Sequence, residues 1–218
     1  MCNYLTDVSD LKRQSATRND RAYWNQRYAE GSHESRDPDP FLVKTYDEFI
    51  APFFPSAGRA LDIAGGTGRH SLWLASHGWS VTMVDVSDVG LGRAQRRWGQ
   101  LKPPGRNRPS SGQIEFVAAD LEAPKSYKIA RRAYDLVLVL FYLQRSLFPA
   151  LKRALKPGGL LVYKTYTLEH RKFGRGPTHP MYFLKPNELL HAFSSLHILH
   201  YHESVKDKGV AEIVVRNL

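Results

Sequence analysis

The sequence contains a single cysteine, Cys2, among 218 residues, so no disulfide can form within the chain. A reducing, cytoplasmic location is the resulting expectation. Long apolar stretches are also missing, since the longest runs from Leu136 to Leu143 and a membrane-spanning helix needs about 20 residues. The opening residues, MCNYLTDVSDLKRQ, include acidic side chains and no apolar core, unlike a secretory signal. These absences predict a soluble protein with no membrane partner.

Acidic residues are in deficit, with 21 Asp and Glu against 31 Lys and Arg, a net charge of +10. Such a charge suggests an anionic partner, and nucleic acid is one candidate. A run without acidic residues between Asp88 and Glu115 contributes Arg93, Arg96, Arg97, Lys102, Arg106 and Arg108. We expect these residues to form a basic patch remote from the functional site. A second basic cluster, from His170 to Arg175, would favour an anionic ligand near it.

Short apolar runs alternate with amphipathic stretches, which is typical of an α/β sheet. The length fits one domain, and a hydrophobic content of 42% supplies a core. The pattern predicts two leading helices, five strand–helix units and a closing antiparallel hairpin. Strands are predicted over 60–64, 80–84, 113–119, 134–140, 160–165, 196–202 and 210–216. Helices are predicted over 20–30, 41–53, 68–77, 87–98, 147–155 and 186–193, and 99–112 is predicted to be an exposed, mobile loop.

The strongest motif is ALDIAGGTGRH, in which a predicted strand runs into Gly65, Gly66 and Gly68 and then into a helix. Glycines at such a corner let a ligand approach backbone N–H groups without a Cβ in the way. An ordinary strand-to-helix turn is the alternative interpretation. Two acidic residues favour the ligand: Asp85 ends the second strand, where it could bind ribose hydroxyls, and Asp120 ends the third, near an adenine.

The identity of the nucleotide follows from what surrounds this corner. The spacing is not the GxGxxG of dinucleotide enzymes, and Asp62 lies close to the loop. A carboxylate there disfavours a pyrophosphate and suits the cationic sulfonium and amino groups of S-adenosylmethionine.

The segments LDIAGGTGRH, VTMVDVS, FVAADLE, YDLVLVLFYLQR and LKPGGLLVYKTY occur in this order. Over residues 58–166 the chain resembles class I S-adenosylmethionine-dependent methyltransferases. Its YWNQRYAEG and DPFLVKTYDEF segments resemble the small tellurite-resistance and thiol-methyltransferase-like branch. The resemblance implies an α/β, Rossmann-like fold with a seven-stranded, mostly parallel sheet, one antiparallel strand and helices on both faces. It implies a methyltransferase domain over 58–218 and an N-terminal helical lid over 1–57.

The same resemblance implies S-adenosylmethionine as cofactor and S-adenosylhomocysteine as product. It assigns Asp62, Gly66 and Gly68 to the methionine side, Asp85 to the ribose, and Asp120 with Leu121 to the adenine. Ala64 stands where the family usually has glycine, and we expect it to require a negative φ. The full predicted cofactor set is Trp24, Asp62, Ala64, Gly65, Gly66, Gly68, Arg69, His70, Asp85, Val86, Ser87, Asp120, Leu121 and Leu140.

The acceptor side is expected at the end of the fourth strand and in the segment after the fifth. Tyr142 and Arg145 are the predicted catalytic residues, with Arg171 and Arg175 as further cations for an anionic acceptor. His197, His200 and His202 lack a complete set of metal ligands, so no metal is predicted.

Three functions remain open. The first is methyl transfer to a small acceptor such as a thiol or chalcogen oxyanion, the second is RNA methylation, and the third is cofactor binding without catalysis. The protein is expected to be a monomer or a homodimer, and nucleic acid is possible but not favoured as a partner.

Overall fold

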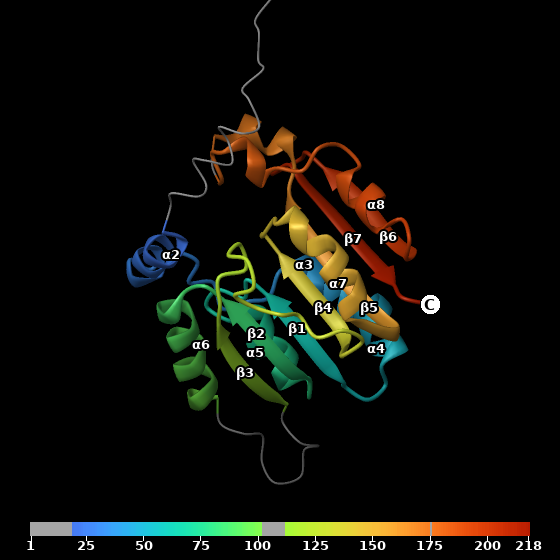
Figure 1. Ribbon diagram of the computed structural model, residues 1–218, viewed down its shortest axis with the longest axis horizontal. Coiled ribbons are helices and arrows are strands. Elements are labelled where there is room, and N and C mark those ends of the chain that lie inside the picture. The colour runs from blue at the N-terminus through green and yellow to red at the C-terminus, as the bar shows by residue number, and fades with distance from the viewer. Residues whose placement is uncertain (1–18, 102–111, 175) are drawn as a thin grey trace, which may run out of the picture.

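The computed structural model describes residues 19–101, 112–174 and 176–218. Its centre is a seven-stranded sheet in the order β3-β2-β1-β4-β5-β7-β6 (Figure 1). The strands are β1 (Arg59–Ile63), β2 (Ser80–Asp85), β3 (Gln113–Ala118), β4 (Tyr134–Leu140), β5 (Leu155–Tyr166), β6 (His197–Ser204) and β7 (Val210–Arg216). Strands β3 to β5 pair in parallel, and β7 runs antiparallel to both β5 and β6. The predicted fold class is confirmed.

The helical segments lie close to their predicted places. They are α2 (Asp20–Ala29), α3 (Pro40–Thr45), η1 (Tyr46–Ile50), α4 (Ala51–Phe53), α5 (Arg69–Ser76), α6 (Asp88–Gln100), η2 (Arg145–Leu147), α7 (Phe148–Ala154), η3 (Leu168–Phe173), η4 (Pro180–Tyr182) and α8 (Glu188–Phe193). Side-chain caps begin three of them: Asn19 for α2, Asp39 for α3 and Ser87 for α6. The predicted helix over 41–53 is continuous but passes through a π-helical turn at η1.

Two predictions about the connections are wrong. Residues 119–133, between β3 and β4, form turns rather than a helix, so the chain does not have five complete strand–helix units. Strand β5 starts at Leu155, so Pro157, Gly158 and Gly159 lie inside it instead of ending a helix. The pairing of β4 with β5 shifts register there, because Gly158 adopts a φ of 79° and forms an irregularity. Most of the predicted 99–112 loop lies outside the described residues.

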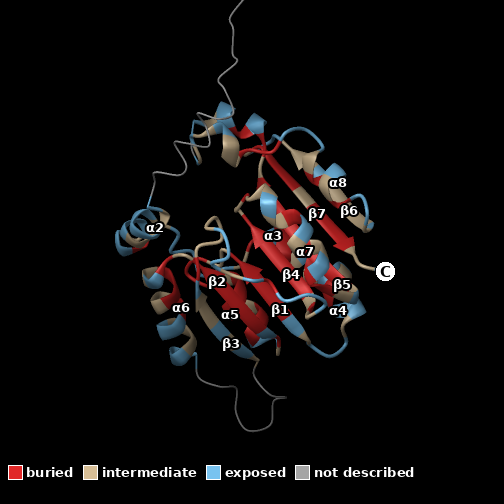
Figure 2. Cartoon of the chain, viewed as in Figure 1, coloured by how far each residue is buried: buried red, intermediate tan, exposed pale blue. Residues whose placement is uncertain are grey.

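The sheet is buried on both faces, which explains the apolar run of β4 (Figure 2). Leu136, Leu138 and Leu140 point to the face covered by α3, η1 and α5. Val137 and Val139 point to the opposite face, against α7 and α8. Within the described ranges, none of the helices has the length and apolar character needed to cross a membrane. Because β1, β2 and β4 are parallel and buried, their carboxyl ends form one firmly held edge, where the site lies.

Candidate cofactor and acceptor site

The glycine corner between β1 and α5 depends on the absence of side chains. Gly66 and Gly68 have φ values of 61° and 82°, in the left-handed region. A Cβ on Gly65 would lie 2.7 Å from the Met83 side chain, and one on Gly68 would lie 2.6 Å from the Ala94 Cβ. The Gly65 N–H donates to the Val84 carbonyl at 3.1 Å, which holds the loop against β2. The loop therefore keeps one defined shape over the sheet edge.

Ala64 corrects an expectation, since its φ is +56° rather than negative. The loop thus has the left-handed conformation that glycine would adopt, and alanine carries the steric cost, about 1–2 kcal/mol. We predict that Ala64→Gly raises the free energy of unfolding by about 0.5–1 kcal/mol, because part of this cost is offset by the greater flexibility of unfolded glycine.

Urea unfolding of the Ala64→Gly protein measures this gain. Gly66→Ala is the matched control, since it places a Cβ in the same region of φ and 2.8 Å from the Tyr28 hydroxyl, and it should lower stability. A loss of stability in Ala64→Gly would show that the left-handed conformation carries no strain.

Asp85 joins the glycine corner to the start of α6. Its Oδ2 accepts the Gly66 N–H at 2.8 Å, and its Oδ1 accepts the Ser87 N–H at 2.8 Å. Burial raises the pKa of Asp85, and the N–H groups of Ser87, Gly66 and Val86 act in the opposite direction. Each carboxylate oxygen retains acceptor capacity, so two neighbouring hydroxyl groups could bind there.

Asp62 lies beneath the same corner and is fully buried. Its Oδ2 accepts a hydrogen bond from the Ser71 hydroxyl at 2.6 Å. Burial raises the pKa of Asp62 to about 7, and the charge of Asp85 raises it further, while Ser71 and Arg69 act against this. Two carboxyl groups that are both disfavoured as anions would be stabilised by a nearby cation.

Helix α2 covers this part of the edge (Figure 1). The Asn25 side chain accepts hydrogen bonds from the Ser87 hydroxyl at 2.6 Å and from the Val89 N–H at 3.3 Å. Tyr28 is buried, and Trp24 stacks on it with 5.6 Å between ring centres. The predicted cofactor residue Trp24 therefore lies one ring away from the glycine corner. Movement of this helix as a lid stays a prediction.

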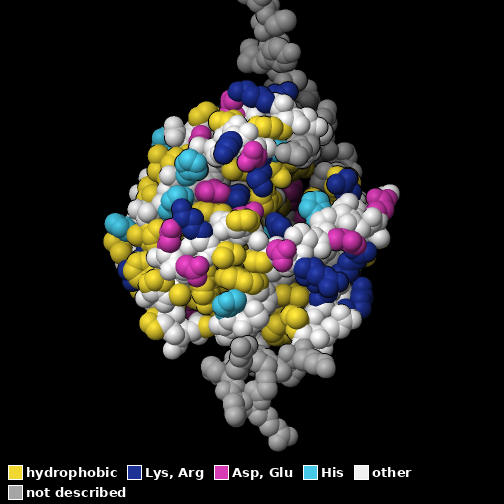
Figure 3. All heavy atoms as spheres, turned by 180° about the vertical axis from the view of Figure 1, so that it is seen from behind, with side chains coloured by type: hydrophobic (Ala, Val, Ile, Leu, Met, Phe, Trp, Pro, Cys, Tyr) yellow, Lys and Arg dark blue, Asp and Glu magenta, His cyan; other side chains and the backbone are white. Residues whose placement is uncertain are grey.

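Two of the residues predicted to form a remote basic patch instead hold the site together. Arg93 donates to Glu34 at 3.1 Å and to the Ala29 carbonyl at 3.3 Å, just after α2. Arg97 donates to the Thr67 carbonyl in the glycine corner at 3.2 Å. Lys102, Arg106 and Arg108 lie outside the described residues. Seen from behind, Lys and Arg side chains gather over α6, whereas acidic and basic groups mix elsewhere on that face (Figure 3).

The predicted adenine and acceptor residues lie close to each other. Asp120 Oδ1 accepts the N–H groups of Glu122 and Ala123, at 2.9 and 3.2 Å, and so caps the turn after β3. Leu121 and Tyr142 both pack against the core on the α7 side. Burial raises the pKa of Tyr142, with smaller contributions from Glu122 and Asp120, and its hydroxyl has no hydrogen-bond partner among the described residues. Tyr142 thus lies on the adenine side, and its catalytic role stays a prediction.

Arg145 has most of its donors engaged within the protein. Its guanidinium contacts Glu188 at 2.5 and 2.9 Å, the Met181 carbonyl at 2.7 Å and the Phe183 carbonyl at 2.9 Å. These bonds fasten the start of η2 to the segment before α8, and a catalytic role for Arg145 stays a prediction. Lys172 forms an ion pair with Glu169, and Arg175 lies outside the described residues.

Beyond β4, the edge contains residues that the sequence did not indicate. Phe141 follows β4 with a φ of 60°, a rare conformation for a bulky side chain that often marks a functional site. The ammonium of buried Lys164 bonds to Asp39 at 2.8 Å and to Glu212 at 2.9 Å. Lys164, a charged residue inside the apolar strand LLVYKTY, was the available signal.

His70 lies on the first turn of α5 near Asp39 and Lys164. Burial lowers the pKa of His70 to about 3, so the imidazole is neutral near pH 7. Its buried Nε2 has no hydrogen-bond partner among the described residues. A neutral ring can form a hydrogen bond with a bound ligand, as predicted, but it brings no positive charge to it.

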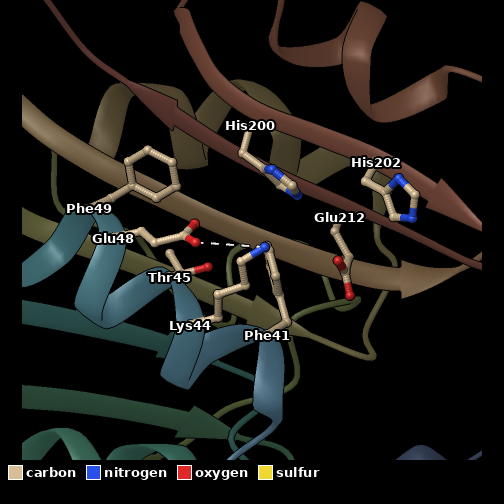
Figure 4. Close-up of a pocket in the computed structure, with 8 residues that line it drawn as sticks. All are labelled: Phe41, Lys44, Thr45, Glu48, Phe49, His200, His202 and Glu212. Carbon is tan, nitrogen blue, oxygen red and sulfur yellow. Dashed lines mark ion pairs between the residues drawn. The ribbon is translucent and has the colours of Figure 1, made fainter.

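A separate pocket of about 240 Å³ lies between α3 with η1 and the β6–β7 hairpin (Figure 4). It is lined by Phe41, Lys44, Thr45, Glu48, Phe49, His200, His202 and Glu212. In the described part of the chain, no group of three His, Cys, Asp or Glu side chains is placed to hold a metal ion.

Comparison with known proteins supports the same edge as a site. Residues 60–159 match the model of a methyltransferase domain. Putative methyltransferase YqeM of Bacillus subtilis is 28% identical over 131 residues, covering 56% of this chain and 48% of the relative. Human glycine N-methyltransferase is 35% identical over 83 residues, covering 38% of this chain and 27% of the relative. The chain thus spans half or less of the length of these curated relatives.

Solved structures agree on the fold. TehB from Haemophilus influenzae aligns with a TM-score of 0.65 and 16% identity, covering 89% of this chain and 67% of that one. The N-methyltransferase NodS from Bradyrhizobium japonicum, solved with S-adenosylhomocysteine, aligns with a TM-score of 0.62 and 20% identity, covering 92% and 99%. Together with the glycine corner and its acids, these similarities identify residues 60–159 as a methyltransferase domain of the class I S-adenosylmethionine-dependent type.

Proposed function

We propose that the protein transfers a methyl group from S-adenosylmethionine to a small acceptor such as a thiol or chalcogen oxyanion. The observation that carries the proposal is the buried Asp85 carboxylate, which bridges the Gly66 and Ser87 N–H groups and retains acceptor capacity for a ribose. Asp62 beside it suits the positive charge of the methionine portion. Two relatives are named as glycine N-methyltransferase and an N-methyltransferase, which supports a small acceptor.

The chemistry assigned to the bound cofactor is donation of a methyl group carried on a positively charged sulfur. The protein's task is to align the acceptor with that methyl and to exclude water. In our proposal, the glycine corner and Asp85 fix the nucleoside, while Trp24 and Tyr28 on α2 screen it from solvent. A thiolate acceptor needs no general base, so the proposal requires no ionisable base at the strand edge.

The two competing functions lose the observations that motivated them. Ala64 suggested a defective cofactor loop, but its φ of +56° is the conformation that glycine would supply. The basic segment suggested RNA, but Arg93 and Arg97 are committed to contacts within the protein. Neither function is favoured by a remaining feature of the described site.

A panel of acceptors incubated with methyl-labelled S-adenosylmethionine tests the proposal. It contains 3-mercaptopropionate, selenite, glycine and a short RNA. We expect label transfer to at least one small acceptor by the wild-type protein and none by Asp85→Ala. Transfer to RNA alone would contradict the small-acceptor proposal, and transfer to none, with cofactor bound, would favour a protein without catalysis.

A further inference from the structure

Lys208 lies in the turn between β6 and β7 and reaches the strand edge where the acceptor is expected. Its Nζ is 5.2 Å from the centre of the Phe141 ring, and Phe141 directly follows β4. The same ring contacts Tyr166, at the end of β5, with 5.2 Å between ring centres. The Lys208 ammonium is therefore placed beside the carboxyl ends of β4 and β5.

The backbone next to Lys208 is fixed rather than free. The Gly209 N–H donates to His170 Nδ1 at 3.2 Å, and the Gly209 carbonyl accepts the Thr167 N–H at 3.0 Å. A Cβ on Gly209 would lie 2.2 Å from the His170 backbone nitrogen, so only glycine fits. These contacts clamp the β6–β7 turn onto the segment that follows β5. Lys208 is thus presented to the edge by a rigid support.

The charge of Lys208 is not matched by an ion pair with a described residue, although the side chain is half-buried. Lys164 approaches the same Phe141 ring, at 5.6 Å, but two carboxylates bind it. Asp39 is near enough for Lys208 to help lower the pKa of its carboxyl, yet its hydrogen bonds go to Lys164 and the Phe41 N–H. An additional anion beside Lys208 would therefore relieve a local excess of positive charge.

We propose that Lys208 binds an anionic oxygen of the methyl acceptor, so that the acceptor is a small molecule bearing a carboxylate or an inorganic oxyanion. This inference rests on the proposed methyl-transfer function. It replaces the cations that the sequence offered for this task, because Arg145 is bound to Glu188 and Lys172 to Glu169. A lysine acts as a point charge, so either kind of anion satisfies it.

Direct binding to the protein saturated with S-adenosylhomocysteine tests the inference without requiring turnover. Calorimetric titration uses 3-mercaptopropionate in one arm and selenite in the other, which distinguishes a carboxylate from an inorganic oxyanion. We expect Lys208→Met to weaken the recognised anion by about tenfold or more, as the loss of one charged hydrogen bond implies. Lys208→Arg should restore most of the affinity. Lys206→Met, an exposed neighbour in the same turn, should bind as the wild type does.

The neutral methyl ester of 3-mercaptopropionate supplies the matched ligand, and its affinity should be equal in wild type and Lys208→Met. S-adenosylmethionine affinity should also be unchanged in this variant. The inference is overturned if the wild type binds neither anion, or if Lys208→Met binds both as tightly as the wild type. Binding that depends on Lys208 without methyl transfer would support the anion site and defeat the proposed function, so the two failures are distinguishable.

Discussion

Replacing Asp85 with alanine is expected to weaken S-adenosylmethionine binding by about 100-fold or more. The variant removes two charged acceptors for ribose hydroxyls, each worth about 1.5–3 kcal/mol. It also releases the Gly66 and Ser87 N–H groups that the carboxylate holds at 2.8 Å. Isothermal titration of the folded variant measures the loss of affinity.

Asp85→Asn is the matched variant, because an amide keeps one acceptor oxygen and nearly the same shape. We expect its affinity to lie between those of the wild type and Asp85→Ala. Circular dichroism of all three proteins separates lost binding from lost folding. An affinity of Asp85→Ala within about threefold of the wild type, far below the effect of one charged hydrogen bond, would contradict the ribose assignment.

Asp62→Asn is expected to have opposite effects on stability and on cofactor binding. The pKa of Asp62 is raised to about 7 in the folded protein, above its value in an unfolded chain. Between about pH 4 and pH 7 the folded state therefore binds more protons than the unfolded state, and the free energy of unfolding falls as pH rises. The asparagine variant lacks this loss, so we expect it to be more stable near pH 8 by about 2–4 kcal/mol.

Urea unfolding at pH values on either side of this window measures the effect, and the gain in Asp62→Asn should shrink at the acidic end. Cofactor affinity should fall by about tenfold in the same variant near pH 8, because a neutral amide does not attract the methionine portion's positive charge. A variant that is less stable than wild type at every pH would show that Asp62 serves the fold instead. Unchanged affinity would remove its role at the cofactor.

The sequence predicted those parts of the site that carry a local signal. The glycine corner, Asp85 and the capping Ser87 each stand at a strand or helix boundary that the apolar pattern locates, and parallel strands bring such boundaries to one edge. The order of the seven strands followed from the same pattern with the resemblance to a known fold. The register irregularity at Gly158 was misread because Pro-Gly-Gly more often ends an element than continues a strand.

Contacts between distant segments could not be predicted in this way. Lys164 and Asp39 are 125 residues apart in sequence, and only the folded chain brings them together. Arg93 and Arg97 were assigned to a remote patch because their partners lie on the far side of β1 in sequence. The left-handed φ of Phe141 follows from its place after β4, where its N–H donates to the Lys164 carbonyl at 2.7 Å. No property of phenylalanine itself predicts that conformation.

Hydrogen exchange with and without S-adenosylmethionine tests the location of the cofactor site most directly. Slower exchange is predicted at the amides of Gly66 and Ser87, with the same effect through the first turn of α5 and in α2 over the corner. Loss of this protection in Asp85→Ala would tie it to the carboxylate. Protection confined to the pocket between α3 and β6, or no protection at the glycine corner under saturating cofactor, would contradict the account.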